Sequence, residues 1–463
     1  MNPFLRKKSI EQLQQESVKN TGLQRVLGLW HLTAIGLGGI IGVGIFVLTG
    51  VAAAEHAGPA VLLSFIIAGL ASAAAALCYA EFAGLIPVAG SAYTYSYAVL
   101  GEATAWLIGW DLLLEYTLVV AVVAIGWSGY MQEILQQLGI SLPAWAQGAP
   151  GTGFGHKVDL IALLVSLSIA GLLTFGIKWG AKFNNLMVVI KLSIILVVIV
   201  VGSFHIHSAN WHPFMPFGFH GVMGGAALVF FAVFGYDTLT TAAEEAKNPQ
   251  RDLPRAVILS LAAALCLYIG MSLVITGMAP YHTLNNAAPV AKAFSHVGLK
   301  WIALIISGAA IAGILSVLFS FMLAGSRIWF SMSRDGLLPK WFAKLHPSYQ
   351  TPYRPTLIIG GITALVSGFT PIHEVAELVN IGTLAAFILI CSSIIVLRKR
   401  RPNLERRFRT PFVPLIPLIG IGFSIYLIIS LPAITWIRFG VWMIVGFVIY
   451  LLYGRRKSKL AKE

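Results

Sequence analysis

Long apolar stretches, separated by short polar segments, fill the chain from residue 30 onward. About 20 apolar residues in a helix span the hydrocarbon core of a bilayer, and most of these stretches approach or exceed that length. The pattern predicts twelve membrane-spanning helices, at residues 30–54, 59–85, 95–130, 158–177, 184–204, 221–245, 255–279, 299–327, 355–371, 376–397, 412–431 and 433–453. The third and eighth are long, and we expect them to extend beyond the bilayer.

Composition agrees with this pattern. The chain has 463 residues, of which 57% are hydrophobic and 11% charged, which excludes an ordinary soluble domain and indicates an all-α integral membrane protein. Residues 1–29 are polar and basic, so they hold no apolar core of a signal peptide, and we expect a cytoplasmic segment with a short amphipathic helix. Three cysteines fall inside predicted spans and are expected to be free thiols: Cys78, Cys266 and Cys391.

The net charge of +14 is distributed unevenly. Of the 32 lysines and arginines, 27 fall in segments that lie on one side of the membrane if the N-terminus is inside. Such a bias marks the cytoplasmic side, which predicts a cell-membrane protein with both termini in the cytoplasm. The basic balance therefore indicates topology and contact with anionic lipid, and no nucleic-acid partner is expected.

Glycines interrupt the first predicted span at Gly38-Gly39-Ile40-Ile41-Gly42-Val43-Gly44-Ile45-Phe46. Each glycine costs a helix up to about 1 kcal/mol relative to alanine, so we expect an unwound segment near residues 40–43. The N–H groups of Val43, Gly44 and Ile45 would begin a second half-helix and suit a carboxylate. The freed carbonyls of Ile40 and Ile41 would suit an ammonium group. Together they describe a site for a zwitterionic amino acid, whereas tight helix packing through small residues is the alternative.

A second interruption lies in the sixth predicted span, at Phe230-Phe231-Ala232-Val233-Phe234-Gly235-Tyr236-Asp237. It comes about ten residues into its span, as the first does, and the sixth span crosses the membrane in the opposite direction. Matched breaks of this kind indicate a transporter with inverted repeats and a binding site between them. We therefore assign 30–204 and 221–397 to two five-helix repeats, 412–453 to two peripheral helices and 454–463 to a basic cytoplasmic tail.

Two predicted spans, the third and the fifth, carry ionisable residues that are candidates for a functional role. Asp111 and Glu115 are one helical turn apart, so at least one is a candidate for proton binding, and polar packing is the alternative. Lys191 lies about 10 Å deep in the fifth span, where a functional role competes with snorkelling to the surface. The histidines between the fifth and sixth spans are too loosely spaced for a metal site, and neither a metal nor a cofactor is expected.

Glu244 and Glu245 end the sixth span, and Arg327 and Arg334 lie in an arginine-rich cytoplasmic segment at and after the end of the eighth. Pairs between them would form a cytoplasmic gate. Surface ion pairs of this kind often add little stability, but between moving elements they can bias an equilibrium.

The chain resembles the amino acid–polyamine–organocation superfamily, and most closely bacterial members of the cationic amino acid transporter family. The resemblance rests on both interrupted spans, on residues 87–95, on Glu244-Glu245-Ala246-Lys247-Asn248-Pro249 and on Ser333-Arg334-Asp335-Gly336-Leu337-Leu338-Pro339. It implies a LeuT-like fold with broken helices 1 and 6, in which the amides at Val43–Ile45 bind the substrate carboxylate. The ammonium-binding carbonyls would be those of Ile40, Ile41, Phe231 and Phe234.

The resemblance also implies roles for single side chains. Phe231, beside Ala232, resembles an aromatic gate over the substrate, and Lys191 resembles a lysine that replaces sodium in proton-coupled members. The favoured function is proton-coupled uptake of L-amino acids by a monomer, and obligate exchange of cationic amino acids is the alternative. An enzyme and a channel are disfavoured, because no catalytic cluster or repeated filter is present. We expect the side-chain pocket to contain Glu115, Thr117, Ser320, Phe321, Met322 and Thr383.

Overall fold

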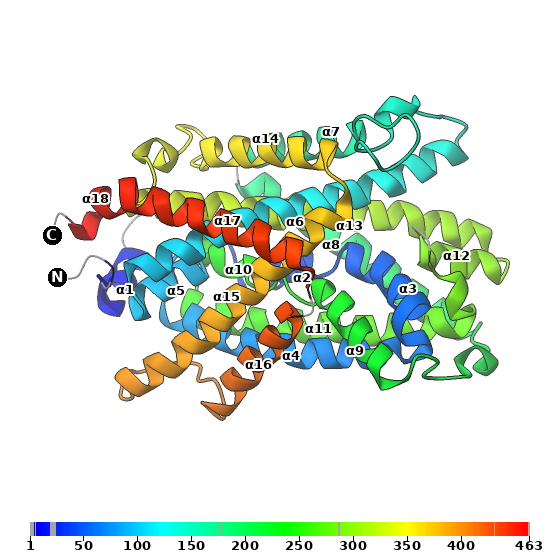
Figure 1. Ribbon diagram of the computed structural model, residues 1–463, viewed down its shortest axis with the longest axis horizontal. Coiled ribbons are helices and arrows are strands. Elements are labelled where there is room, and N and C mark those ends of the chain that lie inside the picture. The colour runs from blue at the N-terminus through cyan, green and yellow to red at the C-terminus, as the bar shows by residue number, and fades with distance from the viewer. Residues whose placement is uncertain are drawn as a thin grey trace.

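The computed structural model describes residues 4, 6–18, 25–175, 177–285, 288–429 and 431–461. Parts of the N-terminal segment (1–3, 5 and 19–24) and the last two residues of the basic tail lie outside these ranges. Within them the chain is helical, and the described residues contain no strand, only two isolated β-bridges. The helices run close to one long axis of the molecule and pack into a bundle (Figure 1).

The helices that build the bundle follow one another with short connections. They are α1 (Ile10–Val18), α2 (Leu29–Ile40), α3 (Thr49–Ala52), α4 (Val61–Leu85), α5 (Ala92–Val99), α6 (Glu102–Gln137), α7 (Leu160–Thr174), α8 (Ile177–Ser203), α9 (Gly218–Val229), α10 (Thr238–Thr241), α11 (Pro249–Met278), α12 (Pro289–His296), α13 (Lys300–Arg334), α14 (Tyr353–Phe369), α15 (Ile372–Arg400), α16 (Leu415–Ile429), α17 (Ala433–Ile449) and α18 (Arg455–Lys457).

Eight helical stretches of the described chain are long and apolar enough to cross a membrane. They are Gly44–Leu85, Glu102–Gln136, Lys182–Ser203, Gly218–Glu245, Pro249–Met278, Lys300–Arg334, Glu374–Arg400 and Ala433–Lys457, and three shorter apolar helices accompany them. Large apolar side chains are exposed on the outer helices, among them Leu196, Leu365 and Leu452, as expected for a surface that faces lipid. The protein is therefore a multi-pass membrane protein, whereas twelve spans and an inverted repeat remain predictions.

The first predicted break is present. Helix α2 ends at Ile40, and Ile41 takes an extended backbone conformation with φ −83° and ψ 109°. Helical structure resumes at Gly44 with a wide π-helical turn, Gly44–Leu48, which leads into α3. Because π-helical turns are frequent at functional sites, this turn supports a functional role for residues 40–48.

The second break is present as well and lies against the first. After α9 and one 3₁₀ turn, Phe230–Ala232, the chain is non-helical to Asp237, and Gly235 has φ +112°. A side chain on Gly39 would come within 2.6 Å of the Gly235 carbonyl oxygen. The two interrupted helices therefore meet backbone to backbone, which only glycine permits.

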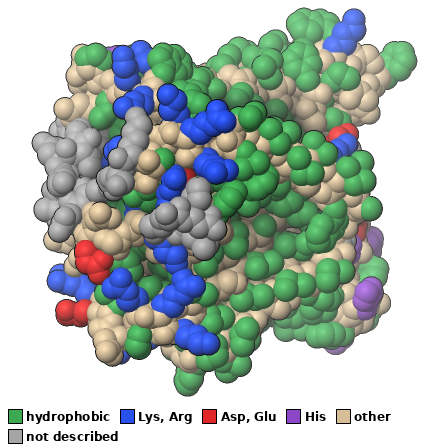
Figure 2. Space-filling view, turned by 60° about the vertical axis from the view of Figure 1, so that its left-hand side comes forward, with side chains coloured by type: hydrophobic (Ala, Val, Ile, Leu, Met, Phe, Trp, Pro, Cys, Tyr) green, Lys and Arg blue, Asp and Glu red, His purple; other side chains and the backbone are tan. Residues whose placement is uncertain are grey.

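Both ends of the described chain lie at one end of the bundle (Figure 1). The Lys459 N–H donates to the Asp335 carbonyl at 3.0 Å, and Arg6 donates to the Arg455 carbonyl at 3.3 Å. Turning this end toward the viewer shows lysine and arginine side chains gathered on it, beside a flank covered by hydrophobic side chains (Figure 2). We call this end of the bundle the basic end.

Candidate functional site

A small cavity lies where the two breaks meet. Its volume is about 10 Å³, which is room for about one water molecule. The side chains around it are apolar, and the polar groups at its edge belong to the backbone. Its lining residues are Gly39, Ile40, Gly42, Val43, Gly44, Val119, Val123, Phe231, Ala232, Phe234, Val317 and Phe321.

Glycine is required on the first break because neighbouring elements approach it closely. A Cβ on Gly44 would overlap the side chain of Ala232, and one on Gly42 would lie 2.5 Å from Val317. The first N–H groups of a helix have no acceptor within that helix, and the helical turn that starts at Gly44 begins at this cavity. The arrangement suits an anion, because N–H groups at a helix start carry partial positive charge.

Lys191 of α8 binds backbone carbonyls at the first break. Its side chain is fully buried, and its ammonium donates to the carbonyls of Leu37 at 2.9 Å, Gly38 at 3.2 Å and Ile41 at 2.6 Å. It also donates to Oγ of Ser316 in α13 at 2.7 Å. Carbonyls at the end of a helix carry partial negative charge, so they compensate a cation that is removed from water. Lys191 therefore does not snorkel, and it joins α2, α8 and α13 at the break.

Tyr268 of α11, which the sequence analysis does not single out, joins the two breaks. Its buried hydroxyl lies 2.9 Å from the Ile40 carbonyl oxygen and 2.7 Å from that of Ala232. A tyrosine in a membrane helix needs a partner for its O–H group, and that is the signal by which it could have been found. The carbonyls of Ile40 and Ile41, which the sequence analysis assigns to a substrate ammonium, thus already accept from Tyr268 and Lys191.

The expected acid pair lies beside the cavity and does not line it. Oε1 of Glu115 accepts a hydrogen bond from Thr383 at 2.7 Å. Neither carboxyl oxygen of Asp111 has a partner among the described residues. Asp237, which follows the second break, accepts a hydrogen bond from Tyr116. Three buried carboxyl groups thus gather on the side of the breaks toward the basic end.

Several expected site residues line the cavity and others do not. The lining includes Ile40, Gly42, Val43, Gly44, Phe231, Ala232, Phe234 and Phe321, while Ile41 binds Lys191 through its carbonyl and Ile45 is buried beside it. Glu115, Thr117, Ser320, Met322 and Thr383 are buried outside the lining.

The reason is the rotation of two helices. The Thr117 hydroxyl donates within its own helix to Leu113, and Ser320 faces α2, where it donates to the Ile35 carbonyl at 3.3 Å. The walls are instead formed by Val119, Val123 and Val317, which carry no polar signal in the sequence.

Two ion pairs lie between the cavity and the basic end. Arg327 of α13 contacts Glu245 at 2.5 Å, and Arg334 holds Glu244 through both terminal nitrogens at 3.0 and 2.7 Å. Glu244 also accepts from the backbone N–H of Ala89 at 3.1 Å. The four residues that the sequence analysis assigns to a gate are therefore in contact.

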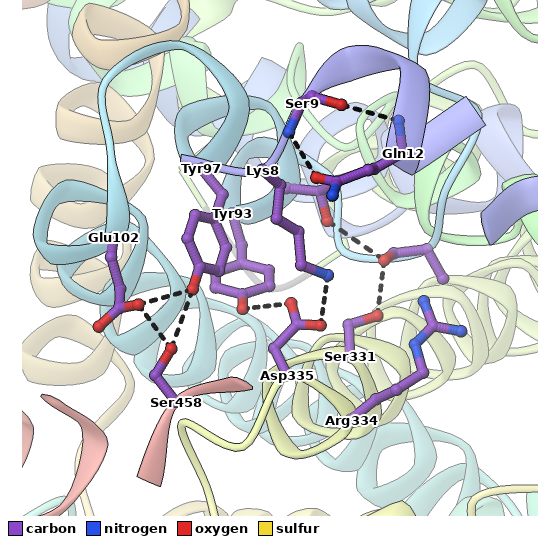
Figure 3. Close-up of polar contacts among 12 residues, drawn as sticks. Lys8, Ser9, Gln12, Tyr93, Tyr97, Glu102, Ser331, Arg334, Asp335 and Ser458 are labelled. Carbon is purple, nitrogen blue, oxygen red and sulfur yellow. Dashed lines mark hydrogen bonds and ion pairs between the residues drawn. The ribbon is translucent and has the colours of Figure 1, made fainter. Parts of the chain in front are cut away.

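A second layer of contacts lies beyond this pair (Figure 3). The Lys8 ammonium contacts Oδ1 of Asp335 at 2.5 Å, and the Tyr93 hydroxyl donates to Oδ2 at 2.6 Å. Burial alone would raise the pKa of the Asp335 carboxyl, but Lys8, Arg334 and the bond from Tyr93 hold this pKa below its usual value. The segment before α1 thus closes the basic end with a charged carboxylate at its centre.

The C-terminal segment joins the same layer through Glu102. Ser458 donates to Glu102 at 2.6 Å and Tyr97 donates to it at 2.8 Å (Figure 3). Tyr450 donates to the same carboxylate at 3.0 Å. Residues from both ends of the chain therefore seal the bundle next to the ion pairs of α13.

Comparison with known proteins identifies the family of this chain. The sequence profile of the amino acid permease family matches residues 27–454. The chain is 48% identical to the methylthioribose transporter of Bacillus subtilis (strain 168), with all of both chains covered. It is 46% identical to the branched-chain amino acid permease BcaP of the same organism, with 98% of each chain covered.

More distant relatives extend this picture. The chain is 32% identical to the vacuolar cationic amino acid transporter 4 of Arabidopsis thaliana, over 99% of this chain and 97% of the relative. These relatives are named as permeases or transporters and not as enzymes, which confirms the non-enzymatic prediction. The chain belongs to the amino acid permease family of the amino acid–polyamine–organocation superfamily.

Proposed function

We propose that this protein takes up L-amino acids across the cell membrane by secondary active transport coupled to protons. The observation that carries the proposal is the meeting of two interrupted helices at one small cavity, with the start of a helical turn on its edge. Such a site can bind the main chain of any amino acid. The substrate carboxylate would lie against the N–H groups of Val43, Gly44 and Ile45.

The substrate ammonium would compete for carbonyls at the breaks. The Ile40 carbonyl accepts from Tyr268, and each carbonyl oxygen has a second lone pair available. The carbonyls of Phe231 and Phe234 lie on the other break and complete the proposed set. This recognition uses only backbone, so it is the same for every amino acid.

We further propose that the preferred side chain is aliphatic. Valines from α6 and α13 and the rings of Phe231 and Phe321 surround the cavity, and no charged side chain lines it. A lysine or arginine head group would be desolvated there without a partner, which is costly. The relative named as a branched-chain amino acid permease supports this preference. The alternative, obligate exchange of cationic amino acids, would need Glu115 to turn toward the cavity.

Lys191 is the proposed coupling residue. Its ammonium binds the first break and occupies a position among backbone carbonyls that would suit a metal cation. Loss of its proton would release these carbonyls and loosen the break, so protonation and opening would be linked. One proton driven by 100 mV supplies about 2.3 kcal/mol, enough for roughly fifty-fold accumulation of a neutral substrate. Glu115 is the rival proton site.

Alternating access would then consist of opening the two sides in turn. The ion pairs of Arg327 and Arg334 and the contacts of Lys8 close the basic end, which we place in the cytoplasm with both termini. The protein would work as a monomer, because the proposed site is complete within one chain.

The test is uptake by the purified protein in liposomes under an imposed pH gradient, with and without sodium. We expect labelled leucine to accumulate with the pH gradient regardless of sodium, and Lys191→Ala to lose accumulation. Lys182→Ala, which removes an exposed lysine from the same helix, is the control and should retain it. Sodium-driven uptake, or accumulation by Lys191→Ala, would contradict the coupling.

A competition panel decides the substrate class. Unlabelled leucine, isoleucine and valine should displace the label, and arginine and lysine should not. Displacement by methylthioribose instead, as the name of one relative suggests, would remove amino acids as the substrate.

A further inference from the structure

A cleft of about 350 Å³ lies at the basic end, away from the central site. One wall is the start of α11, and the other is the connection between α15 and α16. Its lining residues are Gln250, Arg251, Pro254, Arg255, Ile258, Arg407 and Phe408. Neither the cavity at the breaks nor the gate shares a residue with this cleft.

Three guanidinium groups surround the cleft without an anion to balance them. The side chains of Arg251, Arg255 and Arg407 make no hydrogen bond or ion pair with any residue that the structure describes. Nearby carboxyl groups do not fill this role, since Asp252 is largely buried within the first turn of α11 and Glu405 is exposed on the connection. Three like charges around one hollow repel one another unless an anion lies between them.

The wall formed by the connection is fixed in place. Two other arginines of this region bind a single buried acid of α4: Arg398 contacts Glu81 at 2.9 Å, and Nε of Arg406 also lies 2.9 Å from it. The Thr410 N–H donates to the same carboxylate at 2.8 Å. Arg407 and Phe408 lie between these anchors. The cleft is therefore preformed rather than produced by a chance position of a loose segment.

Apolar surface continues from the charged cleft along α11. Arg251 and Arg255 are one turn apart and exposed, and the same helix next exposes Leu259, Ala262, Ala263 and Cys266. Small side chains on this strip leave room for an acyl chain against the helix. A charged hollow joined to an apolar strip matches a lipid, whereas a free phosphate ion would use only the hollow.

We propose that this cleft binds the phosphate headgroup of an anionic phospholipid, with an acyl chain along α11. Guanidinium groups bind phosphate oxygens in pairs, and Gln250 adds an amide donor. Basic pockets between membrane helices are suited to such headgroups. The lipid would join the start of α11 to the connection that Glu81 anchors on α4.

The test is thermal stability in detergent, followed while lipid is added. We expect phosphatidylglycerol to raise the melting temperature by roughly 5 °C at saturation, and phosphatidylcholine to have no such effect. The variant Arg251→Gln/Arg255→Gln/Arg407→Gln should lose the phosphatidylglycerol response. A variant with the same change of charge at the basic end, Lys399→Gln/Arg456→Gln/Lys457→Gln, should keep it. Native mass spectrometry should find phosphatidylglycerol retained by the wild type and this control.

Each other outcome overturns the proposal. If phosphatidylglycerol changed the melting temperature of both variants equally, the lipid would act through the general charge of the basic end and not through the cleft. A shift produced by inorganic phosphate alone, matching that of the lipid, would identify a free anion as the occupant. Absence of any response in the wild type, with no retained lipid, would leave the cleft without a ligand. None of these measurements depends on transport, so they are separate from the test of the proposed function.

Discussion

The ammonium of Lys8 lies 2.5 Å from the carboxylate of Asp335, and both side chains are buried. The two residues are 327 positions apart, so this contact joins the N-terminal segment to the end of α13. It lies on the closed side of the bundle, next to the ion pair of Arg334 and Glu244. In the proposed alternating access, opening of this side would require the segment before α1 to leave.

Lys8→Ala should destabilise the closed state. Removal of one partner of a buried ion pair costs about 3–5 kcal/mol, and we expect the lower end because Tyr93 and Arg334 still contact or face Asp335. The melting temperature in detergent should fall. Lys7→Ala is the matched control, since it removes the same charge from the neighbouring residue, whose ammonium contacts only the Val99 carbonyl among the bonds described. An equal loss in both variants would assign the effect to net charge.

The same pair predicts how stability depends on pH. The pKa of Asp335 is lowered in the folded protein, so its stabilisation is complete above the usual carboxyl pKa and is lost as pH falls through the lowered value. The difference in melting temperature between wild type and Lys8→Ala should therefore stay constant from about pH 5 to pH 8 and shrink below about pH 4. A difference that changes near neutral pH would mean that Asp335 titrates there and takes part in coupling.

Gly44→Ala should abolish transport of every substrate alike. The added methyl group would overlap Ala232 and crowd the edge of the cavity where the substrate carboxylate is proposed to bind. Gly361→Ala in α14 is the control: its Cβ would meet nothing within 4 Å, and alanine favours a helix by up to about 1 kcal/mol. Uptake of several labelled amino acids measures the effect. A changed order of substrate preference in Gly44→Ala, with uptake retained, would show that Gly44 contacts the side chain instead.

Val119→Ala should shift preference toward larger substrates. Removing two methyl groups from the wall enlarges the cavity, and one methylene in an apolar pocket changes discrimination by about 10- to 200-fold. The ratio of phenylalanine to valine uptake should rise by at least tenfold. Thr117→Ala removes a similar volume from the same helix outside the lining, so its ratio should match that of the wild type. A larger change of this ratio in Thr117→Ala than in Val119→Ala would mean that Thr117 lines the side-chain pocket, as expected from the sequence.

Tyr268→Phe should slow transport without unfolding the protein. It removes the single hydroxyl proton that the Ile40 and Ala232 carbonyls share, and a hydrogen bond of this kind contributes about 1 kcal/mol. We expect roughly a tenfold loss of uptake. Tyr426→Phe, at a tyrosine that is 49% exposed, should have no effect. Wild-type uptake in Tyr268→Phe would show that the two breaks act without this link.

The membrane class, the family and both breaks could be predicted because each depends on local composition. Glycine has no side chain to resist unwinding, so Gly42 and Gly235 mark the breaks in the sequence itself. The pocket walls could not be predicted in this way. Whether Thr117 or Val119 faces the cavity depends on the rotation of α6, which packing against other helices determines.

The long-range contacts could not be predicted from the sequence either. In the sequence, Tyr268 is one aromatic residue in an apolar helix. Only the fold places its hydroxyl between two carbonyls that come from different spans. Likewise, nothing near Lys8 in the sequence indicates that Asp335 will be its partner. By contrast, the acids of residues 244–245 and the arginines of α13 stand out as charges at the ends of apolar stretches, which is why their pairing could be anticipated.

The direct contact between Gly39 and Gly235 has a consequence for how such a protein can evolve. Neither residue can acquire a side chain while the other segment stays in place, so the pair is expected to be inherited as a unit. The aliphatic walls come largely from α6 and α13, where Val119 and Val317 can change without moving that junction. Descendants of one ancestor can therefore diverge in the walls of the cavity while keeping the same backbone junction.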